Sequence, residues 1–263
     1  MIEPHSTALV TGSSSGIGEQ FARQLAARDV NLVLVARSED RLQNLAEELR
    51  RAHPAITVTV IPADLSDPSA ADTLAARLAN DGIAIDLLVN NAGFASHGLF
   101  ADEEPGRPAR EIQVNCGSLV SLTAHLLPPM LARGRGGVLN VASTASFQPI
   151  PTMAVYSATK AFVLAFSEAL WAETRKSGVR VLALCPGATA TRFYQVAAAG
   201  GPEFMVRGRQ TPQEVVAVAL RAFESGRSPS VIPGVRNRIL ANGYRISPRA
   251  VLLRMAQRIV RPA

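Results

Sequence analysis

Two side chains four residues apart, Tyr156 and Lys160, form a pair that could move a proton. A free tyrosine has a pKa of about 10, so it is a poor acid or base near pH 7. Residues at positions i and i+4 share one face of a helix, and a nearby ammonium group favours the phenolate, which lowers the pKa of the tyrosine. The pair therefore indicates general acid–base chemistry at a substrate oxygen.

Two polar residues upstream complete a candidate catalytic set. The hydroxyl of Ser143 could hydrogen-bond the reacting oxygen and stabilise a developing alkoxide, and Asn115 could anchor a water that links Lys160 to solvent. Lysine is scarce here, because only Lys160 and Lys176 are lysines among 27 basic residues. An ammonium has a tunable pKa that arginine lacks, which favours a chemical role for Lys160. The alternative is an ordinary half-buried tyrosine beside a surface cation.

A glycine-rich segment, Thr11–Gly18, follows the first expected strand and opens the first expected helix. The N-terminus of a helix presents unpaired N–H groups and a positive partial charge, and glycines let the backbone approach a phosphate closely. The spacing G-x-x-x-G-x-G differs from the G-x-G-x-x-G dinucleotide pattern, and a merely tight connection is the alternative. The candidate cofactor-binding residues here are Gly12, Ser13, Ser14, Gly16, Ile17 and Gly18.

The end of the second expected strand distinguishes two nicotinamide cofactors. An acidic residue there would bind the ribose hydroxyl of NAD, but this chain has Ala36 followed by Arg37. Arg37 could pair with the additional phosphate of NADP, so we expect NADP(H) as the cofactor. The alternative is a surface arginine whose charge Glu39 and Asp40 offset.

Short apolar segments alternate with longer amphipathic ones along the chain. This alternation predicts the α/β class: a single Rossmann-like, doubly wound parallel sheet of about seven strands with helices on both faces, plus a C-terminal helical tail. The expected strands are Thr7–Val10, Asn31–Ala36, Thr57–Ile61, Ala84–Val89, Val138–Val141, Val179–Leu184 and Ser230–Ile232. The expected helices are Gly16–Arg28, Glu39–Ala52, Pro68–Asn80, Pro108–Arg133, Val155–Ser177 and Pro212–Glu224, the fourth broken near Pro128 and Pro129.

The chain divides into a cofactor-binding and catalytic domain, residues 1–233, and a basic helical extension, residues 234–263. The extension ends in the amphipathic stretch Pro248–Val260. The long Ala/Gly-rich segment 188–210 has a length typical of a functional loop such as a lid.

These motifs, together with those at the ends of the later strands, resemble the short-chain dehydrogenase/reductase family over nearly the whole chain. The family's marks occur here in order: Thr11–Gly18, Asp64-Leu65, Asn90-Asn91-Ala92-Gly93, Asn115, Ser143, Tyr156–Lys160 and Pro186–Thr191. The resemblance implies a carbonyl reductase or alcohol dehydrogenase that uses a nicotinamide cofactor. One departure is Ser15, where NADP-preferring members often carry a basic residue, so the expectation of NADP rests on Arg37.

The resemblance also implies roles for the remaining residues. Asp64 would hold the adenine with Leu65 packed near it, and Lys160 would hold the nicotinamide ribose beside Tyr156. The positions expected to border the adenosine ribose and the floor of the site are Asn90, Ala92 and Gly93. Those expected to contact the nicotinamide end are Pro186, Gly187, Thr189 and Thr191.

Apolar side chains predominate in the segments expected to border the substrate. The expected substrate contacts are Phe94, Ser143, Phe147, Ile150, Met153, Tyr156 and Phe193. A pocket lined by such apolar side chains suits a lipophilic ketone or a 3-oxoacyl chain. A non-catalytic NADP-binding redox sensor is the alternative function, although a sensor need not keep the complete Ser143, Tyr156, Lys160 and Asn115 set.

Charge is distributed unevenly. Residues 1–224 have a net charge of −2, whereas residues 225–263 contain eight arginines and no acidic residue. Such a tail could be a solvated helix, or it could attract coenzyme A, an acyl carrier protein or a membrane surface. A nucleic-acid partner is not expected, because the tail has no interleaved aromatic residue apart from Tyr244 and matches no reader motif.

The sequence shows no membrane-spanning run, no signal peptide and no metal-ligand spacing. With two cysteines in apolar surroundings, the default expectation is a cytoplasmic protein. Family members usually assemble through their long helices, so we expect a homo-oligomer, a dimer or a tetramer.

Overall fold

A computed structural model of the 263-residue chain describes residues 2–191, 193, 197, 210–243 and 253. The strands are β1 (Thr7–Thr11), β2 (Asn31–Ala36), β3 (Val58–Pro62), β4 (Leu87–Asn90), β5 (Gly136–Val141), β6 (Val179–Leu184) and β7 (Ser230–Val231). The helices are α1 (Gly16–Ala26), α2 (Glu39–Ala52), α3 (Ala70–Asn80), α4 (Gly106–Ile112), α5 (Ser118–Arg133), α6 (Ala154–Thr174), α8 (Pro212–Ser225) and α9 (Val235–Gly243). Shorter helical segments are η1 (Phe100–Asp102), η2 (Gln113–Gly117) and η3 (Thr144–Phe147).

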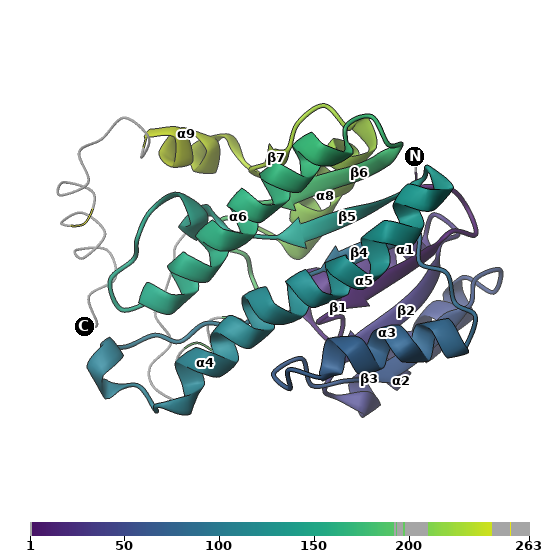
Figure 1. Cartoon of the computed structure of the whole chain (residues 1–263), viewed down its shortest axis with the longest axis horizontal. Coiled ribbons are helices and arrows are strands. Elements are labelled where there is room, and N and C mark those ends of the chain that lie inside the picture. The colour runs from purple at the N-terminus through teal and green to yellow at the C-terminus, as the bar shows by residue number, and fades with distance from the viewer. Residues whose placement is uncertain (1, 192, 194–196, 198–209, 244–252, 254–263) are drawn as a thin grey trace.

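The seven strands form one parallel sheet in the order β3-β2-β1-β4-β5-β6-β7. Helices α1, α2 and α8 cover one face, and helices α3, α5 and α6 cover the other (Figure 1). Two apolar clusters lie between the sheet and these layers, since parallel strands bury both of their faces. The predicted fold class is therefore confirmed.

The helix around Pro128 and Pro129 is not broken, so that prediction was wrong. Helix α5 continues through both prolines to Arg133. Each proline removes an N–H that would bond the carbonyl four residues earlier, on Ala124 and His125. Both of those residues are exposed, so water can satisfy their carbonyl oxygens and the helix persists.

An interruption does occur earlier in the same region. Residues Gln113–Gly117 form a turn of π-helix, η2, between α4 and α5. A π-turn adds a residue to the helix and rotates the side chains that follow, and such turns are frequent at functional sites. Here the turn contains Asn115.

Two predicted segments lie partly or wholly outside the described residues. Most of the proposed lid, segment 188–210, falls there, as does the amphipathic stretch Pro248–Val260 apart from Leu253. Helix α9 is the described part of the predicted extension. The domain boundary at residue 233 stays a prediction.

Candidate active site

The candidate residues gather at the carboxyl ends of the parallel strands. The chain order reverses between β1 and β4, which neighbour each other in the sheet. Ligands of doubly wound folds bind at such a switch point, outside the carboxyl ends of the strands. The turn after β1, the segment after β4 and the loop after β5 therefore converge on one edge of the sheet.

The turn after β1 forms a cradle suited to a phosphate group. Gly12 has a φ of +65°, and a Cβ there would lie 2.8 Å from Asn91 Nδ2. Thr11 Oγ1 accepts hydrogen bonds from the backbone N–H groups of Asn91 (3.0 Å) and Ala92 (2.9 Å), which fixes the turn against the end of β4. Helix α1 has no side-chain cap at Ser15, so its first N–H groups remain for an anion. The residues present fit the pyrophosphate of a dinucleotide.

The other predicted residues of this turn have different surroundings. Ser13 is fully buried, and both its backbone N–H (3.3 Å) and its hydroxyl (3.4 Å) donate to the carbonyl oxygen of Val35. Ser14 and Gly16 are half-buried, and Ile17 packs against the main apolar cluster. Ser14 therefore has the more accessible hydroxyl of the two serines.

Arg37 and Asp64 follow neighbouring strands, β2 and β3, and influence each other electrostatically. Partial burial acts to raise the pKa of Asp64, but hydrogen bonds from Ser66 and the charge of Arg37 hold it below its usual value. Leu65 is buried beside them. Arg37 is exposed, so its guanidinium is accessible to a ligand at this end of the cleft.

The three predicted residues at the end of β4 and just after it have different surroundings. Asn90 is buried, and its amide donates to Thr123 Oγ1 (3.1 Å) and Asn140 Oδ1 (2.9 Å). Its side-chain N–H groups therefore bond residues inside the protein. Ala92 is half-buried and Gly93 is exposed. A Cβ on Gly93 would lie 2.9 Å from Asn115 Oδ1 and 3.4 Å from Lys160 Nζ, which brings the predicted floor of the site next to the catalytic set.

Lys160 and Tyr156 lie together on α6, as their spacing predicts. Lys160 is 5% exposed, and its ammonium donates to the carbonyl oxygen of Val141 (2.8 Å) at the end of β5. Desolvation lowers the pKa of Lys160 to about 8. Its Nζ lies 5.8 Å from the ring centroid of Tyr156, so a positive charge is held beside the phenol at neutral pH.

Ser143 lies at the end of β5 and begins η3. Its Oγ accepts a hydrogen bond from the N–H of Ala145 (3.0 Å), and its own N–H donates to Ser146 Oγ (3.3 Å). Ser146 in turn donates to the carbonyl oxygen of Lys160 (2.7 Å). This chain of bonds ties the predicted serine to the helix that carries Tyr156 and Lys160.

Asn115 connects the segment after β4 to α6. Its Oδ1 accepts from the N–H of Phe94 (3.1 Å), and its Nδ2 donates to the carbonyl oxygen of Phe94 (3.0 Å) and to Thr159 Oγ1 (3.0 Å). Both the oxygen and the nitrogen of this side-chain amide therefore hydrogen-bond to groups of the protein itself. The water expected beside Asn115 stays a prediction.

Glu111, which the motif analysis missed, is a buried carboxylate one helical turn before Asn115. It has no exposed surface, and its Oε2 accepts from the N–H of Ser96 (2.9 Å). Burial raises the pKa of Glu111, and its negative charge acts to raise the pKa of Lys160. The signal in the sequence was a charged residue four positions before a candidate catalytic one.

The segment after β6 faces the phosphate turn. The backbone of Thr189 pairs with that of Gln210 in a short parallel bridge, in which Ala190 N donates to Gln210 O (2.9 Å) and Gln210 N donates to Ala188 O (2.8 Å). Thr189 is buried and donates to the carbonyl oxygen of Gly187 (3.0 Å). Thr191 Cγ2 would lie 3.0 Å from a Cβ on Gly16, so the segment reaches the cradle.

Pro186 and Gly187, also predicted to contact the nicotinamide end, begin this segment. Pro186 is buried, and its carbonyl oxygen accepts from the N–H of Thr144 (2.9 Å) beside Ser143. Gly187 has Asn237 of α9 against it, with no space for a side chain.

The expected substrate contacts separate into two groups. Ile150, Met153, Tyr156 and Phe193 meet in one apolar cluster, where the rings of Tyr156 and Phe193 have centroids 5.2 Å apart. Phe147 is half-buried against a different apolar cluster, which includes Val163 and Leu164 of α6, and its expected substrate contact stays a prediction. Phe94 is half-buried next to Asn115 and has the guanidinium of Arg107 5.5 Å from its ring centroid.

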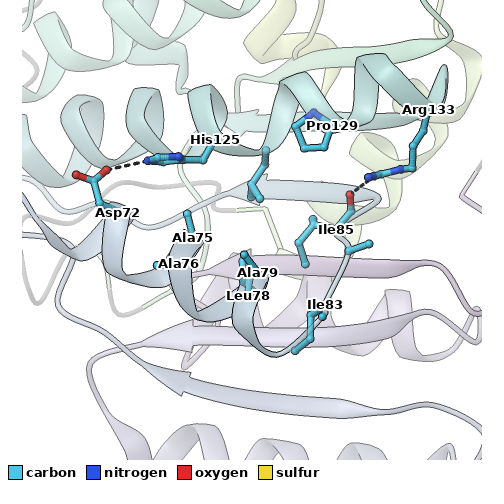
Figure 2. A pocket seen from close by; sticks show the side chains of 13 residues that line it. Asp72, Ala75, Ala76, Leu78, Ala79, Ile83, Ile85, His125, Pro129 and Arg133 are labelled. Carbon is cyan, nitrogen blue, oxygen red and sulfur yellow. Dashed lines mark hydrogen bonds and ion pairs between the residues drawn. The ribbon is translucent and has the colours of Figure 1, made fainter.

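A separate hollow of about 560 Å³ lies between α3 and α5, and Figure 2 shows its lining. Small apolar side chains such as Ala75 and Ala79 form its wall, and His125 bonds Asp72 (2.8 Å) at one end. It contains none of the predicted catalytic residues. The described residues also hold no group of three or more His, Cys, Asp or Glu that could bind a metal.

The family model described as short chain dehydrogenase matches residues 6–200 of this chain. A very-long-chain 3-oxoacyl-CoA reductase from Bos taurus is 35% identical over 193 residues, which are 72% of this chain and 61% of that protein. The chain therefore spans less than two thirds of that relative. A 7beta-hydroxysteroid dehydrogenase from Mediterraneibacter gnavus is 32% identical over 90% of this chain and 89% of that protein.

Among solved structures, a short-chain dehydrogenase from Sphingobium yanoikuyae in complex with NADPH superposes with a TM-score of 0.82. It is 35% identical, and the match covers 91% of this chain and 93% of that chain. The family model, the relatives and the shared fold agree with the ordered motifs at the strand ends. This chain belongs to the short chain dehydrogenase family, a family of oxidoreductases.

Proposed function

We propose that this protein is an NADPH-dependent reductase of lipophilic ketones, with 3-oxoacyl compounds as the first substrate class to test. The observation that carries the proposal is the buried ammonium of Lys160 beside Tyr156, Gly93 and Asn115. When bound, the reduced nicotinamide supplies a hydride to the carbonyl carbon. The side chains of this protein must then place the carbonyl and deliver a proton to its oxygen.

Lys160 and Tyr156 carry out the proton transfer in this proposal. Below its pKa of about 8, Lys160 is an ammonium, and its charge favours the phenolate that remains after Tyr156 has donated its proton. The bond from Lys160 to Val141 O fixes the ammonium without neutralising it. The tyrosine can therefore act as an acid near neutral pH.

Ser143 orients the carbonyl group. Ser143 Oγ accepts the N–H of Ala145 through one of its two lone pairs, and its hydrogen can point to the substrate oxygen. A hydroxyl fixed by such a bond stabilises the developing alkoxide without first having to reorient.

The apolar cluster beside Tyr156 supports a lipophilic substrate. Ile150, Met153 and Phe193 surround the phenol with hydrocarbon and aromatic surface. The names of the relatives above specify a very-long-chain 3-oxoacyl-CoA and a hydroxysteroid, and both the long acyl chain and the steroid skeleton are apolar. A steroid or another bulky ketone is the second substrate class to test.

The first experiment is to follow NADPH oxidation by the purified protein with a panel of ketones that includes 3-oxoacyl thioesters and steroids. Turnover with an apolar ketone, and much slower turnover with a short polar one, is the expected result. Tight NADPH binding without turnover on any ketone would instead support the redox-sensor alternative.

Arg37 determines the cofactor preference in this proposal. The Arg37→Gln variant should bind NADPH about tenfold more weakly, since a charge-assisted bond to the additional phosphate is lost, and should bind NADH almost unchanged. Dissociation constants from nicotinamide fluorescence measure both effects. Arg41→Gln, an equally exposed change on α2, is the control. Equal losses for the two cofactors would contradict the assignment.

We also propose a homo-oligomer that assembles through α5 and α6. Helix α6 exposes a row of small residues together with Phe162, which is 46% exposed and stacks on Phe166 at 6.0 Å. The exposed alanines of this helix are Ala154, Ala158, Ala161, Ala165, Ala169 and Ala172. Small side chains allow a second helix to approach closely.

The double variant Ala158→Glu with Ala165→Glu should therefore dissociate to monomers, because two charges would be buried in the contact between copies. Light scattering after size-exclusion chromatography measures the mass. Asn44→Glu, at an exposed position of α2 on the opposite face of the sheet, should leave the mass unchanged. A monomeric wild-type protein would refute this assembly.

A reducing compartment such as the cytoplasm suits the two cysteines. Cys116 and Cys185 are both buried and free, and burial raises their pKa values to about 11 and about 12. Thiols of this kind stay protonated and unreactive. No helix in the described part of the chain is long and apolar enough to span a bilayer.

A further inference from the structure

Helix α9 leaves its three large apolar side chains, Val235, Ile239 and Leu240, exposed. Asn237 and Ala241 point toward the protein, where Asn237 Nδ2 donates to Gln210 Oε1 (3.0 Å) and to Pro233 O (2.9 Å). On the outward side, Val235 is 70% exposed and Ile239 is 66% exposed. A surface helix normally turns its apolar residues to the core, so this face needs another explanation.

Helix α9 lies next to the candidate active site. Helix α9 contacts η3, which follows Ser143, and Asn237 packs directly against Gly187 in the segment after β6. In Figure 1, α9 extends beyond the sheet on the side of the strands' carboxyl ends. A partner bound to this face would therefore lie beside the entrance to the site.

Positive charge flanks the apolar residues. Arg236 and Arg238 are exposed on the same helix, and residues 225–263 contain eight arginines and no acidic residue. An apolar strip bordered by arginines matches an anionic lipid surface, where the strip enters the acyl boundary and the guanidinium groups meet the headgroups.

We propose that the outward face of α9, formed by Val235, Ile239 and Leu240 with Arg236 and Arg238, docks on an anionic bilayer. The protein then takes its lipophilic ketone directly from the membrane into the adjacent site. The docking rests on the structure of α9, and the substrate uptake rests on the proposed function.

Vesicle flotation with the full-length protein tests the docking separately from catalysis. The wild-type protein should float with vesicles that contain phosphatidylserine and bind pure phosphatidylcholine far less. Val235→Ser with Ile239→Ser should weaken binding to the anionic vesicles by at least tenfold. Arg236→Gln with Arg238→Gln should weaken it by about fivefold for each arginine removed, and added salt should mimic that loss.

Matched variants control for general effects of polarity and charge. Leu131→Ser changes an exposed leucine in the last turn of α5, away from α9, and Arg41→Gln with Arg51→Gln removes two exposed charges from α2. Both controls should float like the wild type. Turnover of a water-soluble ketone should be unchanged in every variant, and turnover of a vesicle-embedded ketone should fall only in the α9 variants.

Three results would overturn the proposal. The first is a wild-type protein that does not float with anionic vesicles, whatever its ketone activity. The second is a change of oligomeric mass in Val235→Ser with Ile239→Ser, which would assign the face to a second copy. The third is that the α9 variants show a raised KM for a substrate carried on an acidic protein but bind anionic vesicles like the wild type.

Discussion

Replacing Tyr156 by phenylalanine should lower kcat/KM for ketone reduction by about a thousandfold and leave NADPH binding within about twofold of the wild type. The change removes one hydroxyl and keeps the ring, which is 9% exposed and packs against Phe193 at 5.2 Å. Proton delivery to the substrate oxygen is lost, whereas the apolar cluster stays filled. Stopped-flow hydride transfer and NADPH titration measure the two quantities separately.

Thermal unfolding supplies the control for this variant. A midpoint close to that of the wild type would show that the lost activity is chemical and not a result of unfolding. If Tyr156→Phe retained more than about a tenth of the wild-type kcat/KM, the assignment of Tyr156 as the acid would be wrong.

Replacing Lys160 by methionine should abolish reduction and at the same time stabilise the protein. Methionine fills a similar volume without a charge, so the desolvation cost that lowers the lysine pKa to about 8 disappears. The bond to Val141 O is lost, which offsets part of the gain. We expect a net increase of about 2 kcal/mol in the free energy of unfolding at pH 7.

The stabilisation should depend on pH in a definite direction. In the unfolded chain Lys160 titrates near its ordinary value of 10.5, so between about pH 8 and 10.5 the folded state binds fewer protons than the unfolded one. The wild type should therefore become relatively more stable as pH rises through this window, and its difference from Lys160→Met should shrink. Urea unfolding at pH 7 and pH 9.5 measures the difference.

Lys176→Met is the matched control, since Lys176 is the other lysine of the chain and is exposed. It should change neither the activity nor the pH dependence of stability. Equal stabilisation by both substitutions, or none by Lys160→Met, would contradict the interpretation that the buried ammonium destabilises the folded state.

Much of the fold and the placement of the motifs could be predicted from the sequence, because both depend on local patterns. Alternating strand and helix segments specify a parallel sheet, and a parallel sheet gathers the residues after each strand at one edge. Tyr156 and Lys160 needed only the helical repeat to be placed together.

Features that depend on tertiary contacts could not be read in this way. The π-turn around Asn115, the interior bonds of Asn90 and the burial of Glu111 arise from neighbours far away in sequence. The expected break at Pro128 failed for a related reason, since the cost of a proline depends on whether water can reach the carbonyl that it leaves unpaired. Residue type alone also does not show that Phe147 packs against a different apolar cluster from Ile150, Met153 and Phe193.

The short bridge between Thr189 and Gln210 has a consequence for how specificity can diversify in this scaffold. Its two backbone hydrogen bonds involve no side chain. They therefore hold the two ends of the intervening twenty residues together independently of side-chain identity. A change in the length of such a closed span costs little in loop-closure entropy, whereas a change at Phe193 would remove a side chain that packs on Tyr156. We therefore expect variation in this span to alter specificity through residues that reach the apolar cluster, such as Phe193, while Tyr156 and Lys160 keep their places on α6.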